Sequence, residues 1–257
     1  MRLDPGWTSK AVSADEALGH IESGMKVFLH GAAATPTPLL NALCKRRDLE
    51  NVSLLHLHIA GDIPFVDPIH EGRFFSISLF TGAALRKPIE EGRADFMPIF
   101  LTDIPKLFRS GTIRLDAALL HLSPPDHHGY CTLGTSVDAA KAASESARII
   151  IAEINEQMPR TIGNTVVPLD KITAFTLTNR PLIEHHSVPE TDVEARIGEI
   201  IAGLVEDGST LQMGIGNIPN AVLTRIHDKC DLGIHTEMFS DHVVDLVEAG
   251  VITNRLK

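Results

Sequence analysis

A glutamate near the end of the chain follows a short apolar run, where a carboxylate could act as a nucleophile. Residues 232–237 (LGIHTE) are predicted to form a strand that ends at Glu237, and Ser240 is predicted to begin the next helix. Ligands of open α/β sheets bind outside the carboxyl ends of strands. A carboxylate beside the positive end of a helix stays ionised and can attack an electrophile. The alternative is that Glu237 only caps that helix. The spacing alone favours this structural role, because acidic residues are common at helix starts.

A glycine-rich loop precedes this segment and could bind a ligand through its backbone. It contains Gly214, Ile215, Gly216, Asn217 and Pro219, and it connects a strand predicted at 209–213 to a helix predicted from residue 220. Two glycines allow a ligand to approach the backbone N–H groups closely. The pattern is not a dinucleotide fingerprint, because proline takes the place of the third glycine. A tight turn without a ligand explains the loop equally well.

Other patterns give weaker indications of chemistry. The loop at 123–130 (SPPDHHGY) follows an apolar strand and is either a functional loop or a stiff connection. The 13 histidines include two adjacent pairs, but they form neither an H-E-x-x-H motif nor a Cys/His cluster with ligand spacing, so we expect no metal. The sequence contains no G-x-S-x-G elbow and no P-loop.

The elements that must position these residues alternate between helix and strand. Helices are predicted after Ser13, which begins a capping-box pattern, and from Thr37, where proline occupies the next position. Strands are predicted at 26–30, 52–58, 94–100, 116–123 and 148–155. Short apolar strands separated by helices predict an α/β fold with mostly parallel sheets and helices on both faces.

A second cycle of the same elements begins near residue 188, with another capping box at Thr191. The segments ESGMKVFLHGAAATPTPLLNAL and VEDGSTLQMGIGNIPNAVLTRI both contain a predicted helix end, a strand, a Gly-rich loop with proline and a second helix, and they align Gly31 with Gly214. We therefore predict two similar domains, at 1–187 and 188–257. The second is too short for a complete copy, which suggests either a fragment or a partner chain that supplies the rest.

Composition limits the classes of partner and compartment. The net charge of −10 disfavours nucleic acid and anionic membranes as general partners. Cys44, Cys131 and Cys230 are far apart, which fits a reducing cytoplasm better than a disulfide framework. The first residues lack the apolar core of a signal peptide, and no apolar run approaches the roughly 20 residues of a membrane span. We expect a cytoplasmic protein.

Several motifs together resemble the acetyl-CoA hydrolase/transferase family, within which the 4-hydroxybutyrate and butyryl-CoA:acetate CoA-transferases are most similar. The main motifs are GIGNIPNAVL and LGIHTEMFSD. The resemblance extends along nearly the whole chain and includes VFLHGAAATPTPLLNAL, EEGRADFMPIFLTDIP, SPPDHHGYCTLGTSVD, INEQMPRTIGNT and VEAGVITN. In this family two similar α/β domains enclose the active site, which agrees with the repeat described above.

The resemblance implies roles for particular residues. The glutamate of the HTEM motif is the family's nucleophile and corresponds to Glu237, and the GIGxxP loop lines the active site through Gly214, Gly216 and Pro219. Coenzyme A is polyanionic, and Arg86, Lys87 and Arg160 are candidate contacts or, alternatively, solvated surface charges. The family also has a later Gly-rich segment for CoA and oxyanion binding that lies beyond residue 257, which leaves the activity of the isolated chain open.

The implied reaction moves CoA between an acyl-CoA and a short-chain carboxylate through a covalent glutamyl-CoA, with 4-hydroxybutyryl-, butyryl- or acetyl-CoA as donor. CoA is then a substrate, and no cofactor is expected. The family implies a homodimer or larger assembly. The alternatives are an acyl-CoA hydrolase that uses the same glutamate, and an inactive partial subunit that needs a second chain.

Overall fold

The computed structural model describes residues 3–184 and 188–257. The chain forms two compact units, Met1–Glu184 and His185–Lys257. Each unit has its own buried clusters of apolar side chains, two in the first and one in the second. The two units are therefore described separately.

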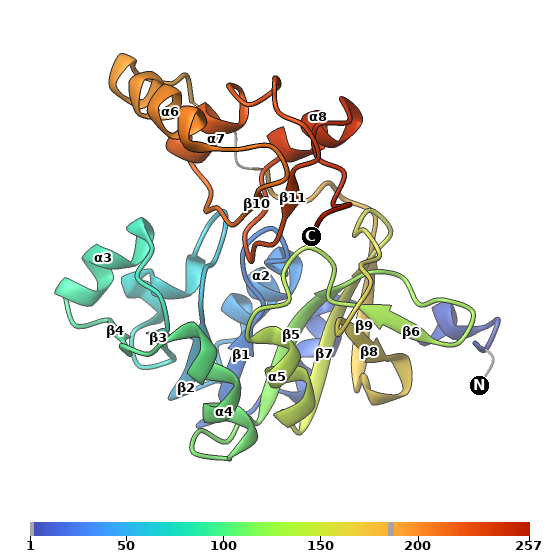
Figure 1. The fold of residues 1–257 in the computed structure, drawn as a ribbon. Helices are drawn as coiled ribbons and strands as arrows, with labels where there is room; N and C mark the ends of the chain where they lie inside the picture. The colour runs from blue at the N-terminus through green and yellow to red at the C-terminus, as the bar shows by residue number, and fades with distance from the viewer. Residues whose placement is uncertain (1–2, 185–187) are drawn as a thin grey trace. The chain divides into compact units, whose positions relative to one another are not determined.

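The first unit is built on a seven-stranded sheet in which every pairing is parallel. The spatial order is β4-β3-β2-β1-β5-β7-β9 (Figure 1). The chain first builds outward from β1 to β4 and then resumes on the other side of β1, so the topological switch point lies between β1 and β5. The strands are β1 (Lys26–Leu29), β2 (Val52–His56), β3 (Phe74–Ser78), β4 (Ala94–Phe96), β5 (Ala117–Leu122), β7 (Ile149–Asn155) and β9 (Ala174–Thr178).

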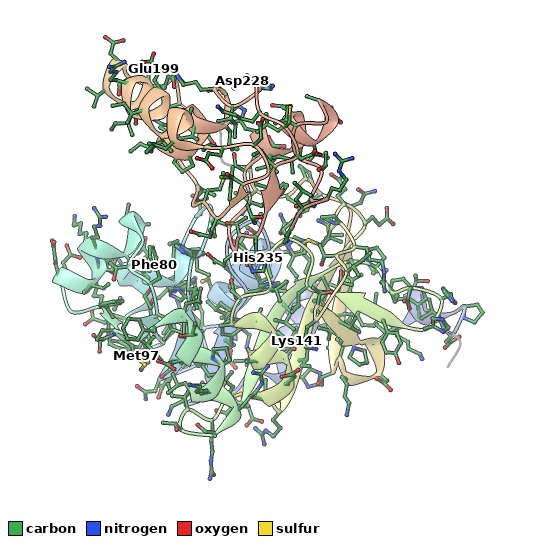
Figure 2. The ribbon with its side chains drawn as sticks, in the orientation of Figure 1. Phe80, Met97, Lys141, Glu199, Asp228 and His235 are labelled. Carbon is green, nitrogen blue, oxygen red and sulfur yellow. The ribbon has the colours of Figure 1, made fainter. Side chains whose placement is uncertain are left out.

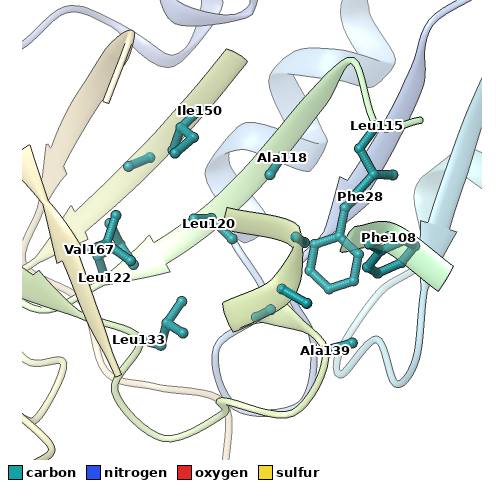
Figure 3. Close-up of a cluster of buried hydrophobic side chains, with 14 of the residues drawn as sticks. Phe28, Phe108, Leu115, Ala118, Leu120, Leu122, Leu133, Ala139, Ile150 and Val167 are labelled. Atoms are coloured by element: carbon teal, nitrogen blue, oxygen red, sulfur yellow. The ribbon is translucent and has the colours of Figure 1, made fainter. Parts of the chain in front are cut away.

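Apolar side chains alternate between the two faces of this sheet. On β1, Val27 and Leu29 belong to a cluster with α1 and α2, whereas Phe28 belongs to a cluster with α4 and α5. Figure 3 shows the second cluster, where Phe28 meets Phe108 edge to face at 5.8 Å between ring centroids. The helices are α1 (Ala14–Ala17), α2 (Thr37–Lys45), α3 (Ala83–Glu90), α4 (Ile104–Arg109) and α5 (Ala140–Ser146). Because both faces are covered, the central strands β1, β2, β5 and β7 consist mostly of apolar residues.

Smaller elements complete the first unit. An antiparallel pair joins β6 (Tyr130–Thr132) to β8 (Val166–Pro168). Short 3-10 helices lie at η1 (Trp7–Lys10), η2 (Leu18–His20), η3 (Pro64–Val66), η4 (Pro68–His70), η5 (Leu101–Asp103) and η6 (Leu169–Lys171).

Within residues 188–257, the second unit contains two short parallel strands and three helices. They are α6 (Asp192–Leu204), β10 (Thr210–Leu211), α7 (Asn217–Leu223), β11 (Gly233–Ile234) and α8 (His242–Glu248). The capping box predicted at Thr191 is confirmed: its side chain accepts the Glu194 N–H, and the Glu194 carboxylate accepts the Thr191 N–H. Leu223, Ile226, Leu232 and Leu246 are fully buried in the core of this unit.

The predicted fold class is confirmed, whereas several element boundaries were wrong. The strands β3 and β9 were not predicted, and β4 covers only the start of the strand predicted at 94–100. In the second unit, α7 begins at Asn217 rather than residue 220, and β11 covers two residues of the strand predicted at 232–237. The pairing of β11 with β10 is itself only two residues long, which limits the strand.

Candidate active site

Glu237 lies in the loop between β11 and α8, three residues after the strand. Its side chain is exposed. Its carboxylate has no hydrogen-bond or ion-pair partner among residues 3–184 and 188–257. Figure 2 labels His235, which precedes Glu237 by two positions in this loop. The carboxylate of Glu237 is therefore available to a ligand.

Thr236, the residue before Glu237, joins this loop to the strand that leads into the glycine loop. Its hydroxyl donates to the Met213 carbonyl at 2.6 Å and accepts the Met213 N–H at 3.2 Å. The N–H of His235 donates to the carbonyl of Leu211 at 2.9 Å. These bonds hold the backbone just before Glu237 beside residues 211–213.

Ser240 forms a second connection on the other side of Glu237. Its hydroxyl donates to the Asn220 side-chain oxygen at 2.8 Å, and Asn220 lies in α7, directly after the glycine loop. The loop that carries Glu237 is thus tied before and after the glutamate to the two ends of the 214–219 segment. The structure brings together Glu237 and the glycine loop of the same unit.

The glycine loop presents its backbone N–H groups to solvent. Gly214, Ile215 and Gly216 are exposed, and their N–H groups donate to no acceptor within the described ranges. Gly216 has φ 113° and ψ −174°, a conformation that is essentially restricted to glycine. Asn217 is the first residue of α7 and Pro219 the third, so proline occupies the first helical turn, where it replaces an N–H that has no helical partner.

Asn217 links the glycine loop to the start of α6. Its side-chain amide donates to Glu194 Oε1 at 3.0 Å, while the other carboxylate oxygen of Glu194 accepts the N–H and the hydroxyl of Thr191. These hydrogen bonds, those from Thr191 first, hold the pKa of Glu194 below its usual range. Asn217 is therefore engaged in fixing the loop.

Two expectations about the surroundings of Glu237 were wrong. Ser240 does not cap the following helix, because its hydroxyl is bound to Asn220 and α8 begins two residues later, at His242. Glu237 does not cap it either, since the cap position is Asp241 and no side chain forms a capping bond there. Four residues lie between Glu237 and the first residue of α8, so Glu237 is outside the first turn of that helix.

The basic residues suggested as CoA contacts lie in the first unit. Arg86 and Lys87 are exposed on α3, and Lys87 is 3.7 Å from Glu91. Arg160 pairs with Asp126 at 2.7 Å and donates to the Tyr130 carbonyl at 2.8 Å. Arg160 therefore fixes the 123–130 loop, while contact of any of these three with CoA stays a prediction.

Sequence reasoning missed Thr236, Ser240 and Asn220 as residues that hold the site, because short hydroxyl and amide side chains have many possible partners. It also missed a buried polar network around Glu153 in β7. One signal was available: Glu153 is the only charged residue in the apolar run 149–155 (IIIAEIN). A charge in a strand buried on both faces requires a partner.

In 3–184 and 188–257, no three side chains of His, Cys, Asp or Glu gather closely enough to hold a metal ion. Within the same ranges, none of the helices combines the length and the apolar character needed to cross a bilayer.

Two curated relatives of this chain are CoA transferases by name. The chain is 47% identical to the succinyl-CoA:acetate/propanoyl-CoA:succinate CoA transferase of Fasciola hepatica, over 98% of this chain and 53% of the relative. It is 40% identical to the 4-hydroxybutyrate coenzyme A transferase of Clostridium kluyveri, over 100% of this chain and 60% of the relative. The chain thus spans about half to three fifths of these relatives.

The chain also resembles solved structures and matches a family model. RipA from Yersinia pestis matches with a TM-score of 0.91 and 32% identity, over 97% of this chain and 61% of RipA. The 4-hydroxybutyrate CoA-transferase from Porphyromonas gingivalis matches with a TM-score of 0.81 and 36% identity, over 95% of this chain and 58% of that structure. The model of the acetyl-CoA hydrolase/transferase N-terminal domain matches residues 2–192. This chain belongs to the acetyl-CoA hydrolase/transferase family.

Proposed function

We propose that this chain carries the nucleophile of a CoA transferase, Glu237, and that the protein moves CoA from a short-chain acyl-CoA to a free carboxylate. The observation that carries the proposal is the attachment of the Glu237 loop to both ends of the glycine loop, through Thr236–Met213 and Ser240–Asn220, with the carboxylate left exposed. This arrangement supports the proposal, because it joins the loop of Glu237 to a segment whose N–H groups have no acceptor among residues 3–184 and 188–257.

The reaction follows from the chemistry of a carboxylate and a thioester. A carboxylate oxygen of Glu237 attacks the acyl carbonyl, the C–S bond breaks, and the products are an acyl-glutamyl anhydride and CoA thiolate. The thiolate attacks the glutamyl carbonyl and displaces the first acid, which gives a glutamyl-CoA thioester. A second carboxylate reverses these steps and leaves as acyl-CoA. No net proton is taken up or released.

The glycine loop supplies the electrostatic part of this mechanism. Each carbonyl addition places negative charge on an oxygen. The N–H groups of residues 214–216 have no acceptor in the described part of the chain and are able to donate to that oxygen. One well-placed donor contributes about 3 kcal/mol to the stabilisation of such a charge. The anhydride is sensitive to hydrolysis, so a transferase also has to exclude water from the reacting carbonyl.

The names of the relatives suggest which acyl groups to test. Their names include succinyl, propanoyl, 4-hydroxybutyryl and butyryl groups, with acetate as a recurring acceptor. We propose a donor such as 4-hydroxybutyryl-, butyryl- or acetyl-CoA, with succinyl-CoA added to the panel. CoA enters as a substrate, and the mechanism does not require a further cofactor.

Chemical trapping tests the role of Glu237. The protein is incubated with an acyl-CoA, treated with borohydride, which reduces the glutamyl thioester, and digested for mass spectrometry. We expect reduction at Glu237 alone and loss of transfer in Glu237→Gln. Glu248→Gln, which changes an exposed glutamate of α8, is the matched control and should transfer at the wild-type rate. Trapping at another residue would reject the assignment.

A hydrolase with the same nucleophile is the second candidate, because the family includes hydrolases. Product analysis separates the two. With acyl-CoA and labelled acetate, a transferase forms labelled acetyl-CoA, whereas a hydrolase releases free CoA at a rate that acetate does not change.

A partial subunit is the third candidate, and the observation that favours it is that the chain spans 53% and 60% of the relatives named above. The assembly in solution is also a proposal: a homodimer or larger assembly, with or without a chain that supplies the remaining part. Light scattering and transfer assays, with and without such a chain, test it. Activity that appears only on mixing supports the partial subunit, and full activity of the chain alone rejects it.

A further inference from the structure

A fully buried carboxylate lies in the sheet of the first unit and plays no part in the proposed chemistry. Glu153 belongs to β7, and its side chain is completely inaccessible to solvent. Thr178, on the neighbouring strand β9, donates its hydroxyl to Glu153 Oε1 at 2.7 Å. A buried charge is unfavourable unless a counter-charge accompanies it.

Arg180 supplies that counter-charge in a fork geometry. Its Nε donates to Glu153 Oε1 at 2.7 Å and its Nη2 to Glu153 Oε2 at 3.0 Å. His121 lies 3.8 Å from the same carboxylate, but burial, followed by the charge of Arg180, lowers the pKa of His121 to about 3, so its imidazole is neutral. Arg180 is thus the cation that balances Glu153.

Asn155 fixes the backbone of Arg180, two residues after Glu153 on β7. Its side-chain oxygen accepts the Arg180 N–H at 3.1 Å, and its amide donates to the Arg180 carbonyl at 2.9 Å. Both the main chain and the side chain of Arg180 are therefore held by β7. A guanidinium held in this way can position a further group.

That further group is the loop after β1. Arg180 Nη2 donates to the carbonyl of Thr35 at 3.0 Å. The Thr35 hydroxyl donates to the Ala32 carbonyl at 2.8 Å and accepts the Ala60 N–H at 3.0 Å. The guanidinium thereby connects the ends of β7 and β9 to residues 31–36.

The 31–36 loop has an unusual backbone. Ala32 has φ 51°, which is uncommon for a residue other than glycine, and its N–H donates to the His58 carbonyl at 2.7 Å. A Cβ on Gly31 would lie 2.0 Å from that same carbonyl oxygen. Such a conformation persists only where the surroundings over-determine it.

The location of the loop is the one where parallel sheets bind ligands. It follows β1, which borders the switch point with β5, and it lies at the carboxyl edge of the sheet. The 31–36 loop connects β1 to α2, just as the 214–216 loop connects β10 to α7. A buried ion pair adds little stability compared with apolar residues of similar volume. The Glu153–Arg180 pair is therefore better explained by its hydrogen bond to the 31–36 loop.

We infer that Glu153 and Arg180 are positioning residues that hold the 31–36 loop in its strained conformation at the switch point, for the CoA transfer proposed above. The inference rests on that proposed function. The Arg180 guanidinium is committed mainly to this network, since Glu153 balances its charge and one N–H of Nη1 donates to the Pro181 carbonyl at 3.3 Å.

Hydrogen exchange and kinetics together test the inference. Arg180→Lys keeps the charge but loses the fork, and Glu153→Gln keeps the shape but loses the charge. In both variants we expect the N–H groups of Ala32, Ala34 and Thr35, all hydrogen-bonded in the structure, to exchange at least tenfold faster. We expect kcat to fall by about 100-fold with KM changed by less than about twofold, because misplacement of a positioned group affects the chemical step.

Arg46 provides a matched control. It forms the same fork, with Asp48, at 2.7 and 2.6 Å, donates to the Leu18 carbonyl at 2.5 Å and is 24% exposed, compared with 23% for Arg180. It follows α2 and therefore lies at the opposite, amino edge of the sheet. Arg46→Lys should leave both the exchange of the 31–36 loop and kcat unchanged.

The double variant Glu153→Gln with Arg180→Met removes both charges. It tests whether the pair holds the 31–36 loop if a single variant does not fold. Fast exchange in the loop with low kcat supports the inference. Wild-type exchange in a folded variant overturns it, and so does fast exchange with wild-type kcat. If the wild-type protein transfers no CoA, the proposed function fails, and exchange alone then decides whether the pair holds the loop.

Discussion

Two glycines of the same loop differ in what their backbones require. Gly216 adopts φ 113°, where any side chain would be strained. Gly214 does not have a positive φ, and a Cβ on Gly214 would meet nothing within 4 Å. Gly216→Ala should lower the free energy of unfolding of the second unit by about 1–3 kcal/mol. Urea denaturation measures this change.

The expected result for Gly214→Ala is a change within about 0.5 kcal/mol, because neither backbone strain nor a clash opposes it. Equal effects of the two substitutions would contradict the backbone explanation and point instead to a general need for small residues in the loop. The comparison needs no substrate and therefore does not depend on the proposed function.

At the scale of the elements, a buried histidine links β2 to β3 and makes stability depend on pH. His56 Nε2 hydrogen-bonds to the Ser76 hydroxyl at 2.8 Å, and burial lowers the pKa of His56 to about 4. In the unfolded chain the histidine has a pKa near 6.5, so between about pH 6.5 and pH 4 it binds a proton that it does not bind in the folded protein. The stabilisation is thus complete above about pH 6.5, and about 3 kcal/mol is lost as the pH falls to about 4.

His56→Gln should lower by up to one the number of protons taken up on unfolding between about pH 6.5 and pH 4. The free energy of unfolding should therefore fall less steeply over this range, as measured by urea unfolding at several pH values. The contributions of His30 and His121, whose pKa values burial also lowers, remain in the variant. His20→Gln, which changes an exposed histidine, is the control. An unaltered pH profile in His56→Gln would show that His56 does not titrate in this way.

At the scale of the whole molecule, each buried cluster lies within one unit, so we expect separable unfolding transitions. Leu246 is fully buried in the second unit and Leu119 in the first. Leu246→Ala should lower the stability of one transition by about 2–5 kcal/mol and leave the other unchanged, and Leu119→Ala should do the opposite. Calorimetry of the two variants checks this, and a single transition shifted equally by both would refute it.

The sequence by itself determined the fold class, since apolar strands such as 117–122 and 149–155 alternate with capped helices and leave few other arrangements. It also singled out Glu237 and the 214–219 loop as candidates, because residue type and position after a strand can be read directly. It did not lead to β3 and β9, although β3 (FFSIS) and β9 (AFTLT) alternate apolar with hydroxyl residues as strands do, and their pairing with β2 and β7 identifies them.

Only the tertiary structure decided which polar groups meet. Thr236 bonds to Met213, 23 positions away, and Arg180 bonds to Thr35, 145 positions away. A hydroxyl, an amide or a guanidinium has many possible partners along a chain, and the pattern of apolar residues specifies which surfaces are buried but not which hydrogen bonds form across them. The attachment of Glu237 to the glycine loop and the buried pair behind the 31–36 loop therefore depend on the folded chain.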